Sequence, residues 1–128
     1  AADALIVGCF QALAIAPEGT RSKTGALQRA KPGVAYLAAR TDAAILPVAI
    51  DGTHRLRDWL RLRRPVCRLI IGKPFHLPRS EGKPSTEQLQ EMADGIMVRI
   101  GALLPEEYWG VYAERIAAVV ERPPERGA

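Results

Sequence analysis

Hydrophobic residues fall into short runs in the first half of the chain and into two longer periodic stretches in the second. The spacing over residues 3–11 predicts a short helix. Residues 13–16 are apolar and stop at Pro17, which is typical of a buried strand. Residues 18–27 are rich in Gly, Thr and Ser and predict a loop. The chain therefore starts with a helix, a strand and a polar loop.

A second helix is expected to open at residues 31–33 and to run to about Arg40, because Pro32 suits the first helical position. Residues 44–50 are apolar throughout, as strands buried on both faces are, although Pro47 removes a ladder donor and indicates an edge or a bulge. A third strand is predicted over residues 66–71, before Gly72 and Pro74.

The second half is helical in pattern. Ser85 and Gln88 form a capping-box pair, and an apolar stripe follows at spacings of three and four. A further amphipathic stretch covers residues 106–120. The order predicts an α/β fold with a parallel or mixed sheet flanked by helices. Three parts are expected: a half domain over residues 1–84, a helical extension packed on it over 85–122, and a tail over 123–128.

Composition narrows the class of protein. The chain of 128 residues is 48% apolar and 25% charged, which is typical of one soluble globular domain. No apolar run approaches the roughly 20 residues of a membrane span. Cys9 and Cys67 share no metal-site spacing, so two buried, reduced thiols are expected, with no disulfide and no metal.

The charge is concentrated in one segment. The chain carries 18 basic and 14 acidic residues, a net charge of +4. Between Gly52 and Arg68 there are six arginines and one acid, Asp58. A patch of arginines predicts a partner that bears phosphate, either lipid headgroups or nucleic acid.

The chemistry is carried by residues 15–22, where a predicted strand runs into a loop. Loops at the carboxyl ends of strands are where α/β folds place ligands. Gly19 allows close backbone approach, Thr20 and Ser22 offer hydroxyls, and Arg21 presents a fork matched to phosphate. The same residues also suit a surface turn in which Glu18 and Arg21 pair with neighbours, and the physics alone leaves the two about even.

The run Ala-Pro-Glu-Gly-Thr-Arg-Ser at residues 16–22 resembles the F-P-E-G-T-R-S block of the 1-acyl-glycerol-3-phosphate acyltransferases, with Ala16 in place of Phe. Gly25, Leu27, Lys31 and residues 33–35 and 37–38 continue the resemblance. Residues 45–53 look like the next block of that family, the V-P-V-A-I segment, at the expected distance. The resemblance extends to about Pro78 and is loose beyond.

The resemblance implies a glycerol-phosphate acyltransferase-like fold, here incomplete. It also implies transfer of a fatty acyl group from acyl-CoA or acyl carrier protein to a hydroxyl of glycerol phosphate or lysophosphatidate, without a further cofactor. Arg21 is then expected to bind the substrate phosphate, and Glu18, Gly19 and Thr20 to shape the site. Ser22 is a weaker member, Lys31 adds positive charge, and Pro47 lies on the substrate or acyl-donor side or is simply a strand-edge proline.

The family's general base, the His of an H-x-x-x-x-D motif that precedes this block, is not found in the chain. We expect the motif to lie before Ala1, in a missing N-terminal part of the same enzyme, and the isolated chain to be inactive. His54 and Asp58 are four apart and can share a helix face, but the spacing is one residue short and the pair follows the block. A catalytic role for them is therefore not expected.

The arginine segment has three interpretations. Interleaved leucines and Trp59 suit an interfacial element at an anionic bilayer, which fits a lipid substrate and a peripheral enzyme on the cytoplasmic face of the membrane. A solvated loop is about equally compatible. No nucleic-acid motif accompanies the charges, so nucleic acid is not expected as a partner. The alternative from another class is a non-catalytic basic domain that docks on anionic membrane or nucleic acid.

Overall fold

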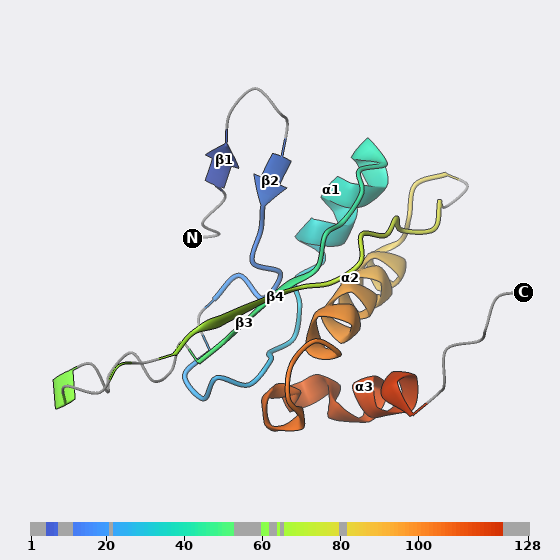
Figure 1. Cartoon of the computed structure of the whole chain (residues 1–128). Coiled ribbons are helices and arrows are strands. Elements are labelled where there is room, and N and C mark those ends of the chain that lie inside the picture. Colours follow the sequence, from blue (N-terminus) through green and yellow to red (C-terminus); the bar gives the residue numbers. More distant parts are fainter. Residues whose placement is uncertain are drawn as a thin grey trace, which may run out of the picture.

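The computed structural model describes residues 5–7, 12–20, 22–52, 60–61, 64, 66–79 and 82–121. Over these residues four short strands and one helix lie before residue 72, and the part that follows is helical. Figure 1 shows helix α2 between α1 and α3. Helix α2 contacts both of the other helices, so it is the central support of the molecule.

The first hairpin pairs β1 (Leu5–Val7) with β2 (Ala12–Ala14) in antiparallel register, Ile6 opposite Leu13. The predicted helix over residues 3–11 is therefore wrong at residues 5–7. Leu-Ile-Val suits a strand because β-branched side chains favour extended backbone. The strand predicted over residues 13–16 begins one residue earlier and ends two residues earlier than expected, and β2 is exposed where we expected it to be buried.

Helix α1 (Gly33–Thr41) confirms the predicted second helix. Pro32 is its N-cap residue, and its fixed backbone angle is already close to the helical one. The helix ends at Asp42, which adopts a left-handed conformation with φ 51°. Ala35 and Ala38 are buried, so α1 packs closely through small side chains.

Strands β3 (Val48–Asp51) and β4 (Arg68–Ile71) form a second antiparallel pair, Val48 opposite Ile71. The predicted strand over residues 44–50 is shortened at its start. Ile45 makes an isolated bridge to Phe75, and regular pairing resumes only after Pro47, which has no N–H to donate. The predicted strand over 66–71 is confirmed over β4.

The expected parallel or mixed sheet is not what the described strands form. They make two separate two-stranded antiparallel sheets. The molecule is mixed α/β, as predicted, but each sheet pairs strands that follow one another in the chain. Alternation of strands and helices indicates parallel pairing only when the crossovers return to the same sheet.

Helix α2 (Thr86–Gly101) begins at the predicted capping box. The Ser85 hydroxyl accepts from the Gln88 N–H at 3.2 Å, and the Gln88 side chain accepts from the Ser85 N–H at 2.9 Å. Two 3₁₀ turns follow, over Glu106–Tyr108 and Gly110–Tyr112, and lead into α3 (Ala113–Val120). The amphipathic stretch predicted over residues 106–120 is thus helical, but it is divided.

The core lies where α2, α3 and the loop between β2 and α1, residues 15–32, meet. Its buried members are Leu27, Ala30, Ala35, Ala93, Met97, Val98, Tyr112 and Ile116. Two of them, Leu27 and Ala30, belong to the loop, so that loop is built into the core. Cys67 is a free and exposed thiol, which corrects the expectation of burial; Cys9 lies outside the described residues.

None of the helices in the described part of the chain has both the length and the apolar character that crossing a bilayer requires.

Candidate functional site

The loop that leaves β2 makes a tight turn at the motif. The Gly19 N–H donates to the carbonyl of Ala16 at 3.1 Å, and Gly19 has φ +64°. A residue with a Cβ is strained in this left-handed conformation, so glycine is the residue that the turn requires. The predicted flexible glycine is therefore fixed in one unusual conformation.

Lys31 is held against this turn from the far end of the loop. Its backbone N–H donates to the carbonyl of Pro17 at 2.9 Å. Its side chain lies over Gly19: a Cβ built on that glycine would be 3.2 Å from the Lys31 ammonium nitrogen. The two residues are twelve apart in sequence, and the fold places a positive charge directly on the turn.

Glu18 is turned inward by a contact within the loop. Its Oε2 accepts from the backbone N–H of Gln28 at 3.1 Å, and the side chain is half-buried. Burial raises the pKa of this carboxyl above its ordinary 4.5, and the hydrogen bond from Gln28 partly offsets that rise. The carboxylate thus ties the turn to the middle of the loop.

The remaining motif residues are distributed around this frame. Thr20 is exposed, and the Ser22 hydroxyl lies 3.3 Å from that of Thr24. Three predicted or considered site residues lie outside the described residues: Arg21, His54 and Asp58. Of the proposed phosphate-binding set, the structure brings Glu18, Gly19 and Lys31 together.

Pro47 lies in the interior. It is buried, and its carbonyl accepts from the Gly72 N–H at 2.9 Å. A Cβ on Gly72 would come 2.9 Å from the Pro47 ring, so the two residues are in close contact. This geometry fits the strand-edge interpretation of Pro47, because the proline interrupts the pairing of its own strand.

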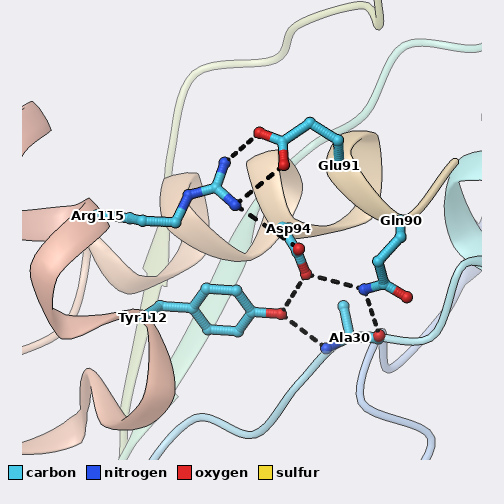
Figure 2. Close-up of polar contacts among 6 residues, drawn as sticks. All are labelled: Ala30, Gln90, Glu91, Asp94, Tyr112 and Arg115. Atoms are coloured by element: carbon cyan, nitrogen blue, oxygen red, sulfur yellow. Dashed lines mark hydrogen bonds and ion pairs between the residues drawn. The ribbon is translucent and has the colours of Figure 1, made fainter. Parts of the chain in front are cut away.

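The far end of the loop is fastened by a polar network with the C-terminal helices (Figure 2). The buried Tyr112 hydroxyl accepts from the Ala30 N–H at 2.8 Å and lies 2.7 Å from Asp94 Oδ1, to which it donates. Burial raises the pKa of Tyr112 to about 12, and the Asp94 carboxylate adds to the rise. The phenol is therefore neutral and acts as a donor throughout the physiological range.

Gln90 and Arg115 complete the network. Gln90 Nε2 donates to the carbonyl of Ala30 and to Asp94 Oδ1, both at 2.9 Å. Arg115 lies 3.6 Å from Asp94 Oδ2 and makes an ion pair with Glu91 (Figure 2). Asp94 thus accepts hydrogen bonds from Gln90 and Tyr112 and makes an ion pair with Arg115.

A second set of hydrogen bonds holds the middle of the loop. The Leu27 N–H donates to the carbonyl of Tyr108 at 2.8 Å, and the Leu27 carbonyl accepts from the Val111 N–H at 3.3 Å. Desolvation raises the pKa of Tyr108, and the carboxylates of Asp51, at the end of β3, and of Glu107 add to the rise. Asp51 also lies 3.7 Å from Arg68.

Sequence patterns do not reveal these hydrogen bonds between the loop and the C-terminal helices. Tyr112 falls within the amphipathic stretch predicted over residues 106–120, and the spacing gives no role to Gln90 or Asp94. A signal exists in the sequence: Asp94 is an acid between the apolar pairs of α2, where a charge needs partners. Which partners it has depends on contacts across 18 and 60 residues, which local spacing does not encode.

Chemically, the site combines the Lys31 ammonium group, the exposed Thr20 and backbone groups of the turn. The Glu18 carboxylate is half-buried and bound to the Gln28 N–H within the loop. Such a set suits an anion with several acceptor oxygens. Within the ranges that the structure describes, no group of three or more His, Cys, Asp or Glu residues is placed to hold a metal ion.

Comparison with known proteins confirms the family resemblance over this region. Residues 7–51 match the family described as Acyltransferase, and this range contains the first sequence block, residues 45–51 of the second block and the Lys31 contact. The chain is 40% identical over 63 residues to a chloroplastic 1-acyl-sn-glycerol-3-phosphate acyltransferase of Arabidopsis thaliana, covering 47% of this chain and 18% of that protein.

A 1-acyl-sn-glycerol-3-phosphate acyltransferase of Cocos nucifera is 49% identical over 53 residues, covering 40% of this chain and 17% of that protein. The matched part therefore spans less than a fifth of the length of either relative. No solved structure matches the chain significantly.

Proposed function

We propose that the chain is the phosphate-binding part of an enzyme of phospholipid synthesis that acylates glycerol phosphate or lysophosphatidate, with acyl-CoA or acyl carrier protein as donor. The observation that supports this most directly is the Lys31 side chain lying over Gly19, inside the Glu-Gly-Thr-Arg-Ser block of a segment that matches acyltransferases. The fold brings this distant cation to the turn where the motif residues meet.

In this proposal the substrate phosphate is bound by Arg21 and Lys31, and Gly19 and Thr20 allow it to approach the backbone. The acceptor hydroxyl then attacks the thioester carbonyl. A C–O bond forms, the C–S bond breaks, the thiol leaves, and the hydroxyl proton goes to a general base. His54 has no acid at the spacing of the family's base motif. The other histidine, His76, has Glu81 at that spacing where the motif has Asp, but the pair follows the block that the motif precedes, so we assign the role of base to no residue of this chain.

The decisive experiment is Arg21→Ala in the protein that contains this chain. We expect kcat/KM for the phosphate-bearing acceptor to fall by roughly 30-fold to 1000-fold, because a bidentate charge-assisted contact is lost. Arg21→Lys should restore part of the rate, since an ammonium lacks the fork. Lys23→Ala removes an exposed cation of the same loop and is the matched control. Unchanged kinetics for a folded Arg21→Ala protein would contradict the assignment.

The 128-residue chain alone is expected to show no acyl transfer, because no general base is assigned within it. The measurement is an assay with lysophosphatidate and acyl-CoA. Turnover above background that His54→Ala abolishes would contradict this part of the proposal and would identify His54 as the base.

We further propose peripheral docking of the arginine segment on anionic lipid. Leu60 is 84% exposed, and Arg61 and Arg64 beside it are exposed as well. Each basic residue near an anionic surface contributes about 1 kcal/mol. Vesicle co-sedimentation should show weaker binding for a variant with both arginines changed to Gln. Equal binding to neutral and anionic vesicles would favour a solvated loop instead.

A further inference from the structure

We infer that Tyr112, with Asp94 and Gln90, is a positioning residue for the proposed phosphate site. It lies outside the matched residues 7–51 and touches no predicted ligand-binding residue. Its effect passes through the backbone of Ala30 to Lys31. The inference rests on the proposed function for its biological meaning, but its structural part is testable by itself.

The directions of the two hydrogen bonds at the Tyr112 hydroxyl determine what this residue does to the loop. Asp94 is an acceptor, so the Tyr112 hydroxyl donates its hydrogen bond to that carboxylate. The oxygen lone pairs are then left to accept from the Ala30 N–H. Because burial and Asp94 hold the phenol neutral, this orientation does not change with pH in the physiological range. Tyr112 is thus a fixed acceptor aimed at one backbone group.

The second step is the peptide unit between Ala30 and Lys31. Its carbonyl accepts from Gln90 Nε2 at 2.9 Å, and its N–H donates to the carbonyl of Pro17 at 2.9 Å. One rigid peptide plane therefore joins helix α2 to the residue that precedes Glu18. Rotation of this plane moves the start of the Lys31 side chain.

The third step is the contact at the turn. The last three side-chain atoms of Lys31 all lie 3.1 to 3.2 Å from the Cβ position of Gly19. A side chain with four rotatable bonds reaches one spot reproducibly only if its backbone is fixed. Tyr112 fixes the N–H side of Ala30 and Gln90 the carbonyl side, so the C-terminal helices determine where the ammonium lies.

The test uses the 128-residue chain and two substitutions. Tyr112→Phe keeps the ring and removes the acceptor of the Ala30 N–H, and Gln90→Ala removes the donor to its carbonyl at a partly exposed helical position. Ile96→Val is the matched control. Ile96 is fully buried on α2, outside the core cluster that contains Leu27 and Ala30, and its shortening lowers stability without touching the loop.

The first readout is the nuclear Overhauser contact between the Lys31 side chain and the Gly19 α-protons. We expect it in the unmodified chain and in Ile96→Val, and we expect it to be lost or strongly weakened in Tyr112→Phe and Gln90→Ala. Retention of the contact in both Tyr112→Phe and Gln90→Ala, under conditions where these variants are folded, would overturn the inference whatever the chain binds.

The second readout is titration with inorganic phosphate. We expect Tyr112→Phe to weaken phosphate binding by about 5-fold to 10-fold through the lost buried hydrogen bond, with Ile96→Val unchanged. A chain that binds no phosphate but loses the Lys31 contact in the variants would contradict the proposed function and support the positioning role. Equal weakening by all three substitutions would show a general stability effect and overturn the inference.

Discussion

Lys31 lies over Gly19 so closely that a single added methyl group at Gly19 would be 3.2 Å from the ammonium nitrogen. That spacing is tighter than ordinary van der Waals contact, and Gly19 also has a positive φ of 64°. The turn therefore requires glycine because of its own backbone conformation, and a Cβ at this position would in addition displace the Lys31 side chain by a few tenths of an ångström.

Gly19→Ala is expected to lower the free energy of unfolding by about 1 to 2 kcal/mol, the usual cost of a left-handed L-residue. It should also displace the Lys31 side chain and weaken phosphate binding. Urea unfolding and phosphate titration measure the two effects. Gly82→Ala is the control, since Gly82 shares a positive φ of 91° but a Cβ there meets no atom within 4 Å. Equal loss of phosphate binding in both variants would contradict the role of the contact.

Gly110→Ala should be more damaging. Gly110 has φ +54°, and a Cβ on it would overlap the carbonyl oxygen of Leu27. We expect a loss of about 2 to 4 kcal/mol of stability, from backbone strain and from overpacking together. The loss should be visible as a lower midpoint in urea.

A substitution in the opposite sense is available in α2. Gly95 is inside the helix, and a Cβ there meets nothing within 4 Å. Gly95→Ala is expected to stabilise the chain by about 0.5 to 1 kcal/mol, because alanine loses less conformational freedom in a helix. A lower midpoint for this variant would show that the position is more crowded than described.

The chain has three tyrosines, and they should titrate in a fixed order. The Arg40 guanidinium lowers the pKa of Tyr36 below 10, desolvation raises that of Tyr108, and burial raises that of Tyr112 to about 12. Absorbance at 295 nm should show Tyr36 ionising first, and Tyr112→Phe should remove the step near pH 12.

The raised pKa of Tyr112 also predicts how the stability of the chain depends on pH. The folded-state pKa of Tyr112 is above its unfolded value near 10, so the folded state binds its proton more tightly. Its contribution is fully present below about pH 10 and is lost as the pH rises toward 12. A stability profile for Tyr112→Phe that falls as steeply as that of the unmodified chain between these values would contradict the assignment.

Glu18→Gln tests the partly buried carboxyl. Its folded-state pKa is raised above 4.5, so the ionised form is the less favourable one in the folded chain. Gln keeps an acceptor for the Gln28 N–H and carries no charge. We expect the variant to be more stable than the unmodified chain at pH 7, with the difference shrinking as the pH falls through the raised folded-state pKa and largely gone below 4.5. Lower stability of the variant at pH 7 would mean that the charge itself stabilises the loop.

Local signals explain which elements were predictable. The capping box at Ser85 and Gln88 and the proline at the start of α1 act within one helical turn, so the sequence displays them directly. The strand over residues 5–7 was missed because a run of three apolar residues fits a helix or a strand equally well, and only its partner decides.

The candidate site divides in the same way. The motif around Glu18 was recognisable as a run of residues, and Lys31 was recognised through the resemblance. The support by Tyr112 was not predicted, because a tyrosine at helical spacing is typical of a core and its hydroxyl contact is made with a residue far away in sequence.

The distance between Ala30 and Tyr112 also has a consequence in time. The two residues are 82 positions apart. At a synthesis rate of about 5 to 20 residues per second, the tyrosine follows the alanine by roughly 4 to 16 seconds. During that interval the backbone N–H of Ala30 has no phenol to bind. A chain halted on the ribosome before the last 3₁₀ turn therefore contains the whole motif but lacks Tyr112. The loop can take its final conformation only after this turn, which leads into α3, has been synthesised.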